Sequence, residues 1–142
     1  MQAGQDPAAE NIVDNVIGDH DTAFFTNNQN FNWIQIDFGS TVENIDRILV
    51  VKRANRVTPS PADVADRFKS IDVRIGDDPV PAGTARTDLA SVGNALCLSF
   101  AGDNDATAET LECSSPLSGR YMTLQNTVAT YLEIDELFIV TT

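Results

Sequence analysis

Apolar and polar residues alternate in several short runs of this chain, and this period of two constrains its fold more than any other feature. In the segment 32–38 (NWIQIDF), Ile34, Ile36 and Phe38 fall on one face of an extended chain and the intervening residues on the other. The segment 69–76 (KSIDVRIG) repeats the pattern. Alternation over such lengths predicts β-strands that bury one face.

Further apolar runs, separated by turn-rich loops, extend this prediction along the chain. The segment 45–53 (IDRILVVKR) is almost continuously apolar and rich in β-branched residues, as expected of a strand covered on both faces. The segments 119–125 (GRYMTLQ) and 131–140 (YLEIDELFIV) supply the last strands. Glycines mark the intervening loops, and helical patterns are few. The sequence therefore predicts an all-β chain folded as an antiparallel β-sandwich.

The length and composition suit one such domain. The chain has 142 residues, of which 42% are hydrophobic, enough for an ordinary core. Residues 1–10 (MQAGQDPAAE) are small and polar and are predicted to form a flexible N-terminal arm. Residues 11–142 are predicted to form a single domain.

The charge balance restricts the partners. Nine Lys and Arg against 21 Asp and Glu give a formal net charge of -12. Such a surface repels nucleic-acid phosphates and anionic lipid headgroups, so we expect neither partner. No apolar run approaches the roughly 20 residues that span a bilayer, and the loop 54–66 has no Trp or Phe to insert into one. Calcium, by contrast, suits an acidic chain.

Cys97 and Cys113 are the only cysteines, and His20 is the only histidine. This set is too small for a zinc cage, and nothing around His20 supports a Cys–His nucleophile pair. The remaining interpretations are two buried free thiols or one disulfide, which would stabilise the fold by about 3 kcal/mol. We favour the disulfide and with it an oxidising compartment, so the chain is expected to be secreted or extracellular.

Five of the nine basic residues lie between positions 52 and 69, around a loop that joins two predicted strands. Arg53 ends the first of these strands and Arg67 precedes the second, so both are expected at one end of the sandwich. Paired guanidinium groups present fixed donors that suit hydroxyls, ring oxygens or a carboxylate. The alternative is that the arginines form surface ion pairs with the neighbouring acids Asp63, Asp66 and Asp72.

Acidic and amide side chains gather before the first predicted strand and within the last one. They are Asn11, Asp14, Asn15, Asp19, Asp21, Asp135 and Glu136. Carboxylate, amide and main-chain oxygens are the ligands that calcium prefers, so a loop and a distant strand end could together hold this ion. The alternative is a solvated turn held by its own Asn and Asp hydrogen bonds.

Four segments carry a family pattern, and they include an aromatic-x-x-x-Asp-x-Gly motif at Trp33, Asp37 and Gly39 and a Gly-Arg-Tyr motif at 119–121. The segments are WIQIDFGSTVENIDRILVVKR, SIDVRIGDD, CSSPLSGRYMTLQ and YLEIDELFIV. In this order and spacing, the chain resembles the F-type lectin (fucolectin) domain, a lectin branch of the discoidin or coagulation-factor C-type fold. The resemblance implies a jelly-roll-like β-sandwich of the galactose-binding-domain-like type.

The same resemblance implies a disulfide, a structural arginine and a metal site. NALC (94–97) is similar to the family's Asn-x-x-Cys segment, which implies a Cys97–Cys113 disulfide, and Arg120 is implied to tie the last strands together. The family's calcium ligands match this chain at both of the acidic places described above. The implied metal ligands are Asn11, Asp14, Asn15, Asp135 and Glu136, with Asp135 acting through its main-chain carbonyl. Val16 and Asp19 are alternatives to Asn15.

The implied sugar site departs from the family pattern. The family holds fucose with one His and two Arg that flank adjacent cysteines; Arg53 and Arg67 match the arginines, but the cysteines and the His are missing. Asn27 or Asn28 could replace the imidazole as a hydrogen-bonding group. A phenylalanine of the same region would cover the apolar face of the sugar, the candidates being Phe24, Phe25 and Phe31, although Phe24 is more plausibly a core residue.

These inferences predict a calcium-stabilised carbohydrate-binding domain that recognises fucose or a related sugar on glycans or glycoproteins. A single site would be weak, so we expect a homo-oligomer or a larger host protein to provide several copies. The alternative is an interaction or structural domain of the same fold in an extracellular assembly. No nucleophile elbow, paired metal-binding His or phosphate-binding loop occurs, so we expect no enzyme activity.

Overall fold

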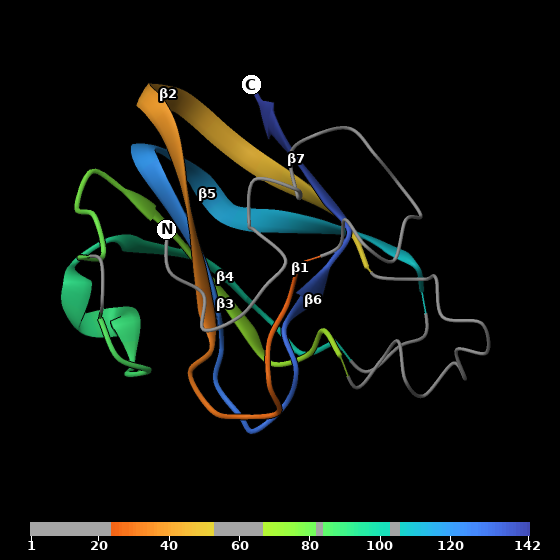
Figure 1. The fold of residues 1–142 in the computed structure, drawn as a ribbon. Coiled ribbons are helices and arrows are strands. Elements are labelled where there is room, and N and C mark those ends of the chain that lie inside the picture. The colour runs from red at the N-terminus through yellow and green to blue at the C-terminus, as the bar shows by residue number, and fades with distance from the viewer. Residues whose placement is uncertain (1–23, 53–66, 82–83, 103–105) are drawn as a thin grey trace.

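The computed structural model describes residues 24–52, 67–81, 84–102 and 106–142, and nothing below refers to the structure of the others. Seven strands occur in this part of the chain (Figure 1): β1 (Phe24–Phe25), β2 (Trp33–Val51), β3 (Ile71–Gly76), β4 (Ala95–Phe100), β5 (Ala108–Asn126), β6 (Glu133–Ile134) and β7 (Glu136–Thr141). A single short 3-10 helix, η2 (Leu89–Val92), accompanies them. Every pairing is antiparallel, as the sequence predicted.

The strands form one large sheet with the order β4-β3-β5-β2-β7 and a small sheet in which β1 pairs with β6. The strands β2 and β5 each run for 19 residues and bend midway, so that the sheet folds back on itself (Figure 1). Their pairing shifts register between Asp37 and Arg47. The sequence predicted separate strands at 32–38 and 45–53. The structure joins the first to the second, as far as Val51, through these irregularities, which Gly39 at φ 80° helps to form.

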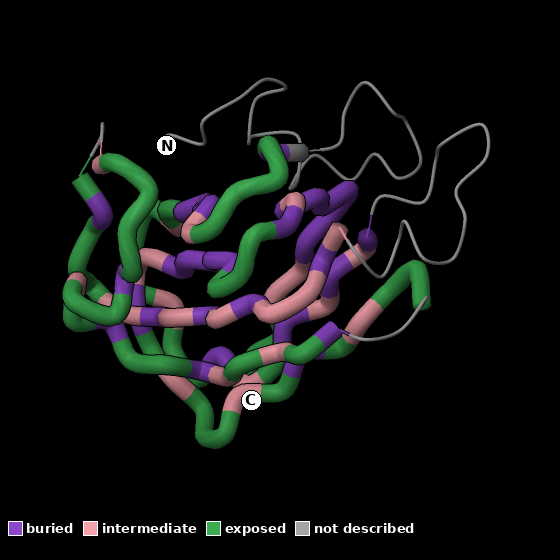
Figure 2. The backbone as a smooth tube through the Cα atoms, turned by 90° about the horizontal axis from the view of Figure 1, so that it is seen from below, coloured by how far each residue is buried: buried purple, intermediate pink, exposed green. Residues whose placement is uncertain are grey.

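The two halves of the bent sheet enclose the main core. Ile34 and Ile36 from the first half of β2 lie in one apolar cluster with Ile48 and Val50 from its second half. The predicted inward face of 69–76 is confirmed, because Ile71, Val73 and Ile75 are buried in the same cluster. Buried residues recur along the strands in Figure 2, whereas the turns that join them are exposed. The result is the all-β, jelly-roll-like sandwich that the sequence predicted.

The outer face of the first half is covered by the described residues 77–81 and 84–93, which we call the covering loop. Trp33 points to this side, opposite Ile34, and packs with Val80 and Leu89 in a second apolar cluster. Two buried glutamines fix the loop to the sheet. Gln35 Oε1 accepts the Val80 amide at 2.6 Å, and Gln125 Oε1 accepts the Leu89 amide at 2.9 Å. The alternation in 32–38 is therefore confirmed, but both faces are buried as far as Ile36, and Asp37 is exposed.

Cys97 of β4 and Cys113 of β5 form a disulfide, which confirms the predicted pairing. The bond spans 16 positions of sequence, and the Cys97 side chain is buried in the main core. It therefore ties the edge strand β4 to the long strand β5. Within the described ranges, no helix combines the length and the apolar character needed to cross a bilayer.

Candidate functional site

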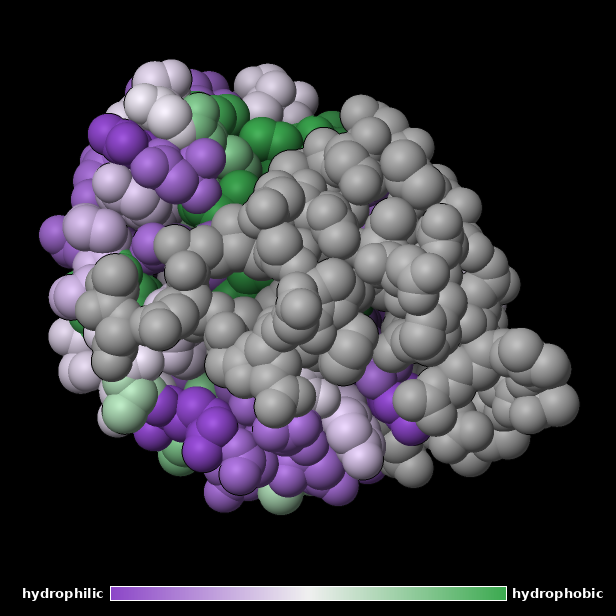
Figure 3. All heavy atoms as spheres, viewed as in Figure 1, coloured by the Kyte–Doolittle hydropathy of each residue, from purple (hydrophilic) through white to green (hydrophobic). Residues whose placement is uncertain are grey.

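Three segments that are distant in sequence meet at one end of the sandwich. They are the loop 26–32 between β1 and β2, the segment 67–70 before β3, and residues 127–133 between β5 and β6; together we call them the rim. Main-chain hydrogen bonds join them: the Gln29 amide donates to Thr130, the Thr127 amide to Ser70, and the Glu133 amide to Arg67. The loops of the rim meet at the bottom of Figure 1, and the surface there is mostly hydrophilic in Figure 3.

Arg67 is held in place at the rim by two side chains. Its Nη1 lies 2.5 Å from Oε1 of Glu133, and its guanidinium carbon lies 4.6 Å from the centre of the Tyr131 ring. The Glu133 side chain is only 2% exposed, whereas that of Arg67 is 15% exposed. The ion pair and the cation–π contact orient a guanidinium group that still reaches the surface. Because this ion pair uses one of its several N–H donors, the others can serve a ligand.

The structure brings several of the predicted sugar-binding residues to the rim. Asn27 and Asn28 are exposed in the loop 26–32, and Phe25 of β1 pairs with Glu133 of β6. Phe31 follows in the same loop, half-buried and with a left-handed φ of 58°. Arg53 lies outside the described residues, so its convergence with Arg67 stays a prediction.

The ion pair of Arg67 differs from the alternative that the sequence suggested. Asp72 faces Arg74 at 3.8 Å, and the partner of Arg67 is Glu133, 66 positions away in sequence. Asp63 and Asp66 lie outside the described residues. Sequence reasoning missed Glu133 and Tyr131, although their spacing of two places both side chains on one side of an extended segment.

Two of the five predicted calcium ligands are described. Asp135 and Glu136, at the junction of β6 and β7, are 1% and 0% exposed. Oε1 of Glu136 accepts the Leu137 amide at 3.2 Å, and the Asp135 amide donates to Val51 of β2 at 2.9 Å. Asn11, Asp14 and Asn15 lie outside the described residues. Among the described residues alone, no group of three or more His, Cys, Asp or Glu side chains is arranged to hold a metal ion.

Other motif residues serve the fold. Asp37 accepts hydrogen bonds from Nε and Nη2 of Arg120 at 2.7 and 2.8 Å and from the Gly39 amide at 2.8 Å. The Arg120 hydrogen bonds, together with that of Gly39, lower the pKa of Asp37 from 3.8 to about 2. Arg120 thus has a structural role, as the resemblance implied, but it ties β5 to β2 and not the last strands to each other. Gly119 is required because a Cβ there would lie 2.6 Å from the main chain of Gly76.

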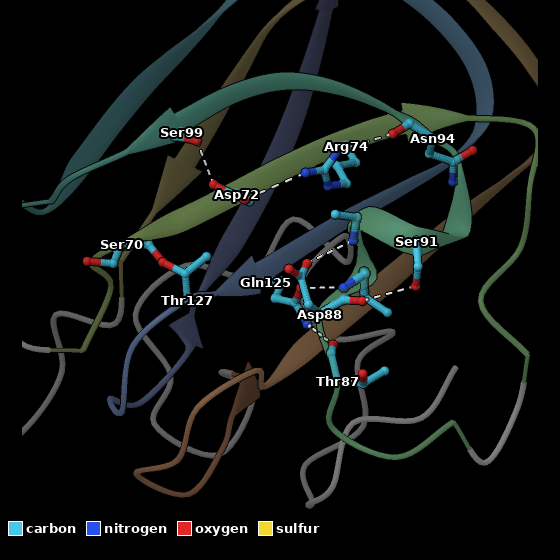
Figure 4. Close-up of polar contacts among 12 residues, drawn as sticks. Ser70, Asp72, Arg74, Thr87, Asp88, Ser91, Asn94, Ser99, Gln125 and Thr127 are labelled. Atoms are coloured by element: carbon cyan, nitrogen blue, oxygen red, sulfur yellow. Dashed lines mark hydrogen bonds and ion pairs between the residues drawn. The ribbon is translucent and has the colours of Figure 1, made fainter.

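The polar side chains outside the rim largely satisfy one another (Figure 4). Along β3 and β4, Ser99 donates to Asp72 at 2.6 Å and Arg74 donates to the Asn94 carbonyl at 3.3 Å. In the covering loop, Asp88 caps η2 by accepting the Ala90 amide at 2.9 Å. These side chains are thus used within the sheet and within the covering loop, which leaves the rim as the stronger candidate for a binding site.

No family model and no curated protein matches this sequence. Solved structures do match in fold. The lectin domain of lectinolysin, in complex with Lewis B antigen, superposes with a TM-score of 0.70 at 21% identity over 95% of this chain and 84% of that one. A family 32 carbohydrate-binding module from Streptococcus pneumoniae EndoD gives 0.67 at 13% identity over 95% and 86% of the two chains.

A fucolectin from striped bass (Morone saxatilis) serum gives a TM-score of 0.68 at 18% identity over 94% of this chain. This chain spans only 41% of that longer protein. The chain has the fold of these lectin and carbohydrate-binding modules. The fold that the F-type lectin resemblance implied is therefore confirmed.

Proposed function

We propose that this chain is a non-catalytic, lectin-like domain that binds carbohydrate at the rim, with fucose or a related neutral sugar as its ligand. The proposal rests on the placement of Arg67, the arginine of the rim. Arg67 is oriented by Glu133 and Tyr131 at the same end of the sandwich as the exposed Asn27 and Asn28, on a fold shared with carbohydrate-binding modules.

The chemistry of the rim suits a neutral sugar. The hydroxyls and the ring oxygen of a sugar need directional donors and acceptors, which the guanidinium and the two amides supply. A hydrogen bond from a charged donor contributes about 1.5–3 kcal/mol, more than a neutral one. Val128, 41% exposed in the loop between β5 and β6, offers apolar surface at the same end. Glycans or glycoproteins outside the cell would be the natural partners, and several copies would raise the avidity.

The sugar site can be tested with two matched variants. Purified protein is applied to a glycan array, and titration calorimetry then measures the affinity for the best ligand. We expect fucosylated glycans to bind, and Arg67→Lys to weaken binding at least about tenfold, because the substitution keeps the charge but loses the planar fork of donors. Arg47→Lys, on an exposed part of β2 outside the rim, should leave the affinity unchanged. An Arg67→Lys variant that binds as well as wild type would refute the assignment.

A second candidate is favoured by the missing histidine. With His20 as its one histidine and Arg67 already in an ion pair, a chain of this fold could instead dock onto a protein in an extracellular assembly. Absence of binding to every glycan on the array would favour this alternative. The Cys97–Cys113 disulfide supports an oxidising, extracellular setting for either function.

We further propose that Asp135 and Glu136 hold Ca²⁺ together with Asn11, Asp14 and Asn15. Two adjacent carboxylates buried to 1% and 0% exposure suit a cation, because carboxylates at such depth are costly unless positive charge lies nearby. The proposed ligands all offer oxygen, which matches the preference of calcium. The bound ion would neutralise these carboxylates and join the segment before β1 to the end of β6.

Chelation tests the calcium site. Excess chelator should lower the melting temperature of the wild-type protein, and added Ca²⁺ should restore it, because an ion that binds only the folded chain stabilises it. In the Glu136→Gln variant, this difference should shrink. A wild-type melting curve that does not respond to chelator would remove calcium from the proposal and leave the sugar site standing.

A further inference from the structure

Asn32 and Asn126 face each other at the end of the pairing between β2 and β5. The Asn126 amide donates to the Asn32 carbonyl, and the Phe31 amide to the Asn126 carbonyl, both at 3.1 Å. Both side chains are buried, Asn126 completely. They lie where the chain leaves the sheet to form the loops 26–32 and 127–132, so these two side chains occupy the base of the rim.

The two side-chain amides bind the carbonyls of both loops. Nδ2 of each asparagine lies between 2.7 and 3.1 Å from three main-chain carbonyl oxygens. Gln29 and Thr130 contribute carbonyls that both amides share. The full set of carbonyls belongs to Asn27, Gln29, Val128 and Thr130. The pair therefore forms a clamp across loops almost a hundred positions apart, as the separation of 98 between Asn32 and Thr130 shows.

Few side chains could replace these asparagines. Four carbonyl oxygens directed at one place repel one another unless donors lie between them, and the Asn amides supply these donors. Asp has nearly the same shape but presents only acceptors, and Leu presents no donor. The Oδ1 atom of Asn126 is buried and accepts no hydrogen bond from any described residue. The orientation of this side chain is thus set by its donors alone.

We propose that Asn32 and Asn126 are positioning residues for sugar binding. This inference rests on the proposed function. The clamp fixes the carbonyls on either side of Asn28 and the carbonyl of Val128 itself, so it sets how the exposed amides and the apolar Val128 are presented at the rim that also holds Arg67. Thr26 adds to the same effect, because its hydroxyl accepts the Leu132 amide at 2.9 Å. A rim that is ordered before the sugar arrives loses less conformational entropy on binding.

Asn94, directly after the covering loop, provides a matched control. Its side chain is as buried as that of Asn32, and it also fixes a loop through main-chain groups. Nδ2 of Asn94 donates to the Asp78 carbonyl at 2.7 Å, and Oδ1 accepts the Asp78 amide at 3.1 Å. Replacing Asn94 by Asp thus disturbs an equivalent contact outside the rim.

The test compares Asn126→Asp and Asn32→Asp with Asn94→Asp in the full chain. Affinity for the best glycan on the array is measured well below all melting temperatures, together with hydrogen exchange of the Gln29, Phe31 and Leu132 amides. The clamp predicts that Asn126→Asp weakens binding at least about tenfold and accelerates exchange in the rim. Asn94→Asp should lower the melting temperature but keep both the affinity and the exchange rates of the rim.

Two results would overturn the positioning role. One is that Asn126→Asp binds as tightly as wild type with unchanged exchange. The other is that Asn94→Asp weakens binding equally, which would reduce the effect to general stability. Failure of the proposed function gives a different result, because wild-type protein itself would then bind no glycan. The exchange rates of the rim would still decide in that case whether the clamp orders the two loops.

Discussion

The rim and the covering loop are fixed by similar means but differ in where they bury charge. Both use buried amide side chains to bind main-chain groups: Asn32 and Asn126 at the rim, and Gln35 and Gln125 under the covering loop. The covering loop adds the apolar contact of Leu89 and Val80 with Trp33. The rim instead contains the Arg67–Glu133 ion pair, and the buried acids Asp135 and Glu136 follow two and three positions after Glu133.

At the rim, the fold keeps buried charges that selection for stability alone would not favour. Neutral amides and apolar side chains can fix a loop without burying charge, as the covering loop does. A buried ion pair often stabilises a protein no more than apolar residues of the same volume, because both charges lose their hydration. A charge retained at the rim is what the proposed sugar site requires, and the same comparison can be tested by removing one element from each region.

The largest effect is expected at the rim. Arg67→Met should lower the free energy of unfolding by about 3 kcal/mol, because it takes the positive charge of Arg67 away from the buried carboxylate of Glu133. Glu133→Gln in the same chain should recover part of this loss. Denaturant unfolding of the single and double variants measures both effects, with Arg47→Met as the exposed control. A loss no greater than that of the control would show that the rim does not depend on its charges.

A smaller effect is expected in the covering loop. Leu89→Ala should cost about 2 kcal/mol, at the low end of buried Leu→Ala substitutions because the second cluster is small. Sugar affinity should not change, because Leu89 packs against Trp33 under the covering loop and does not belong to the rim. Calorimetric titration of this variant, next to its unfolding curve, checks both expectations. Weakened sugar binding in Leu89→Ala would mean that the two regions are coupled.

Local patterns in the sequence predicted the elements on which both regions are built. Alternation in 32–38 correctly placed Ile34 and Trp33 on opposite faces, and the same argument holds for Ile71, Val73 and Ile75. The single fold class and the disulfide were also correct, the latter because the resemblance supplied a pairing that two cysteines alone left open. These features follow from neighbours in sequence or from the order of motifs.

The partners at the rim could not be predicted in the same way. Glu133 pairs with a residue 66 positions away, and Asn32 binds a carbonyl 98 positions away. Lys52 shows the same limit: it reads as a charged strand end, yet it is 1% exposed and lies 2.8 Å from Glu109. Such contacts depend on which strands become neighbours in space. The alternation of residues shows on which face of a strand a side chain lies, but it does not show which residue of another segment lies next to it.

The smallest effect concerns an ion pair that is exposed, in contrast to the buried pair of the rim. Asp37 and Arg120 have side chains that are each 43% exposed. The pKa of Asp37 is lowered from 3.8 to about 2 in the folded chain, mainly by the hydrogen bond from Arg120. Folding therefore favours the charged form, so the contribution of Asp37 to stability is present above pH 3.8 and is lost as the pH falls towards 2.

Asp37→Asn should remove this part of the pH dependence and leave stability at neutral pH only slightly reduced, because solvent and salt screen an exposed pair. Unfolding curves of wild type and variant between pH 2 and 5 measure the difference, with Glu43→Gln as an exposed control on the same strand. Curves that stay parallel through this interval would show that Asp37 titrates alike in the folded and unfolded chains. The contrast with Arg67→Met would then rest on burial alone, because the exposed pair would contribute nothing measurable while the buried one still would.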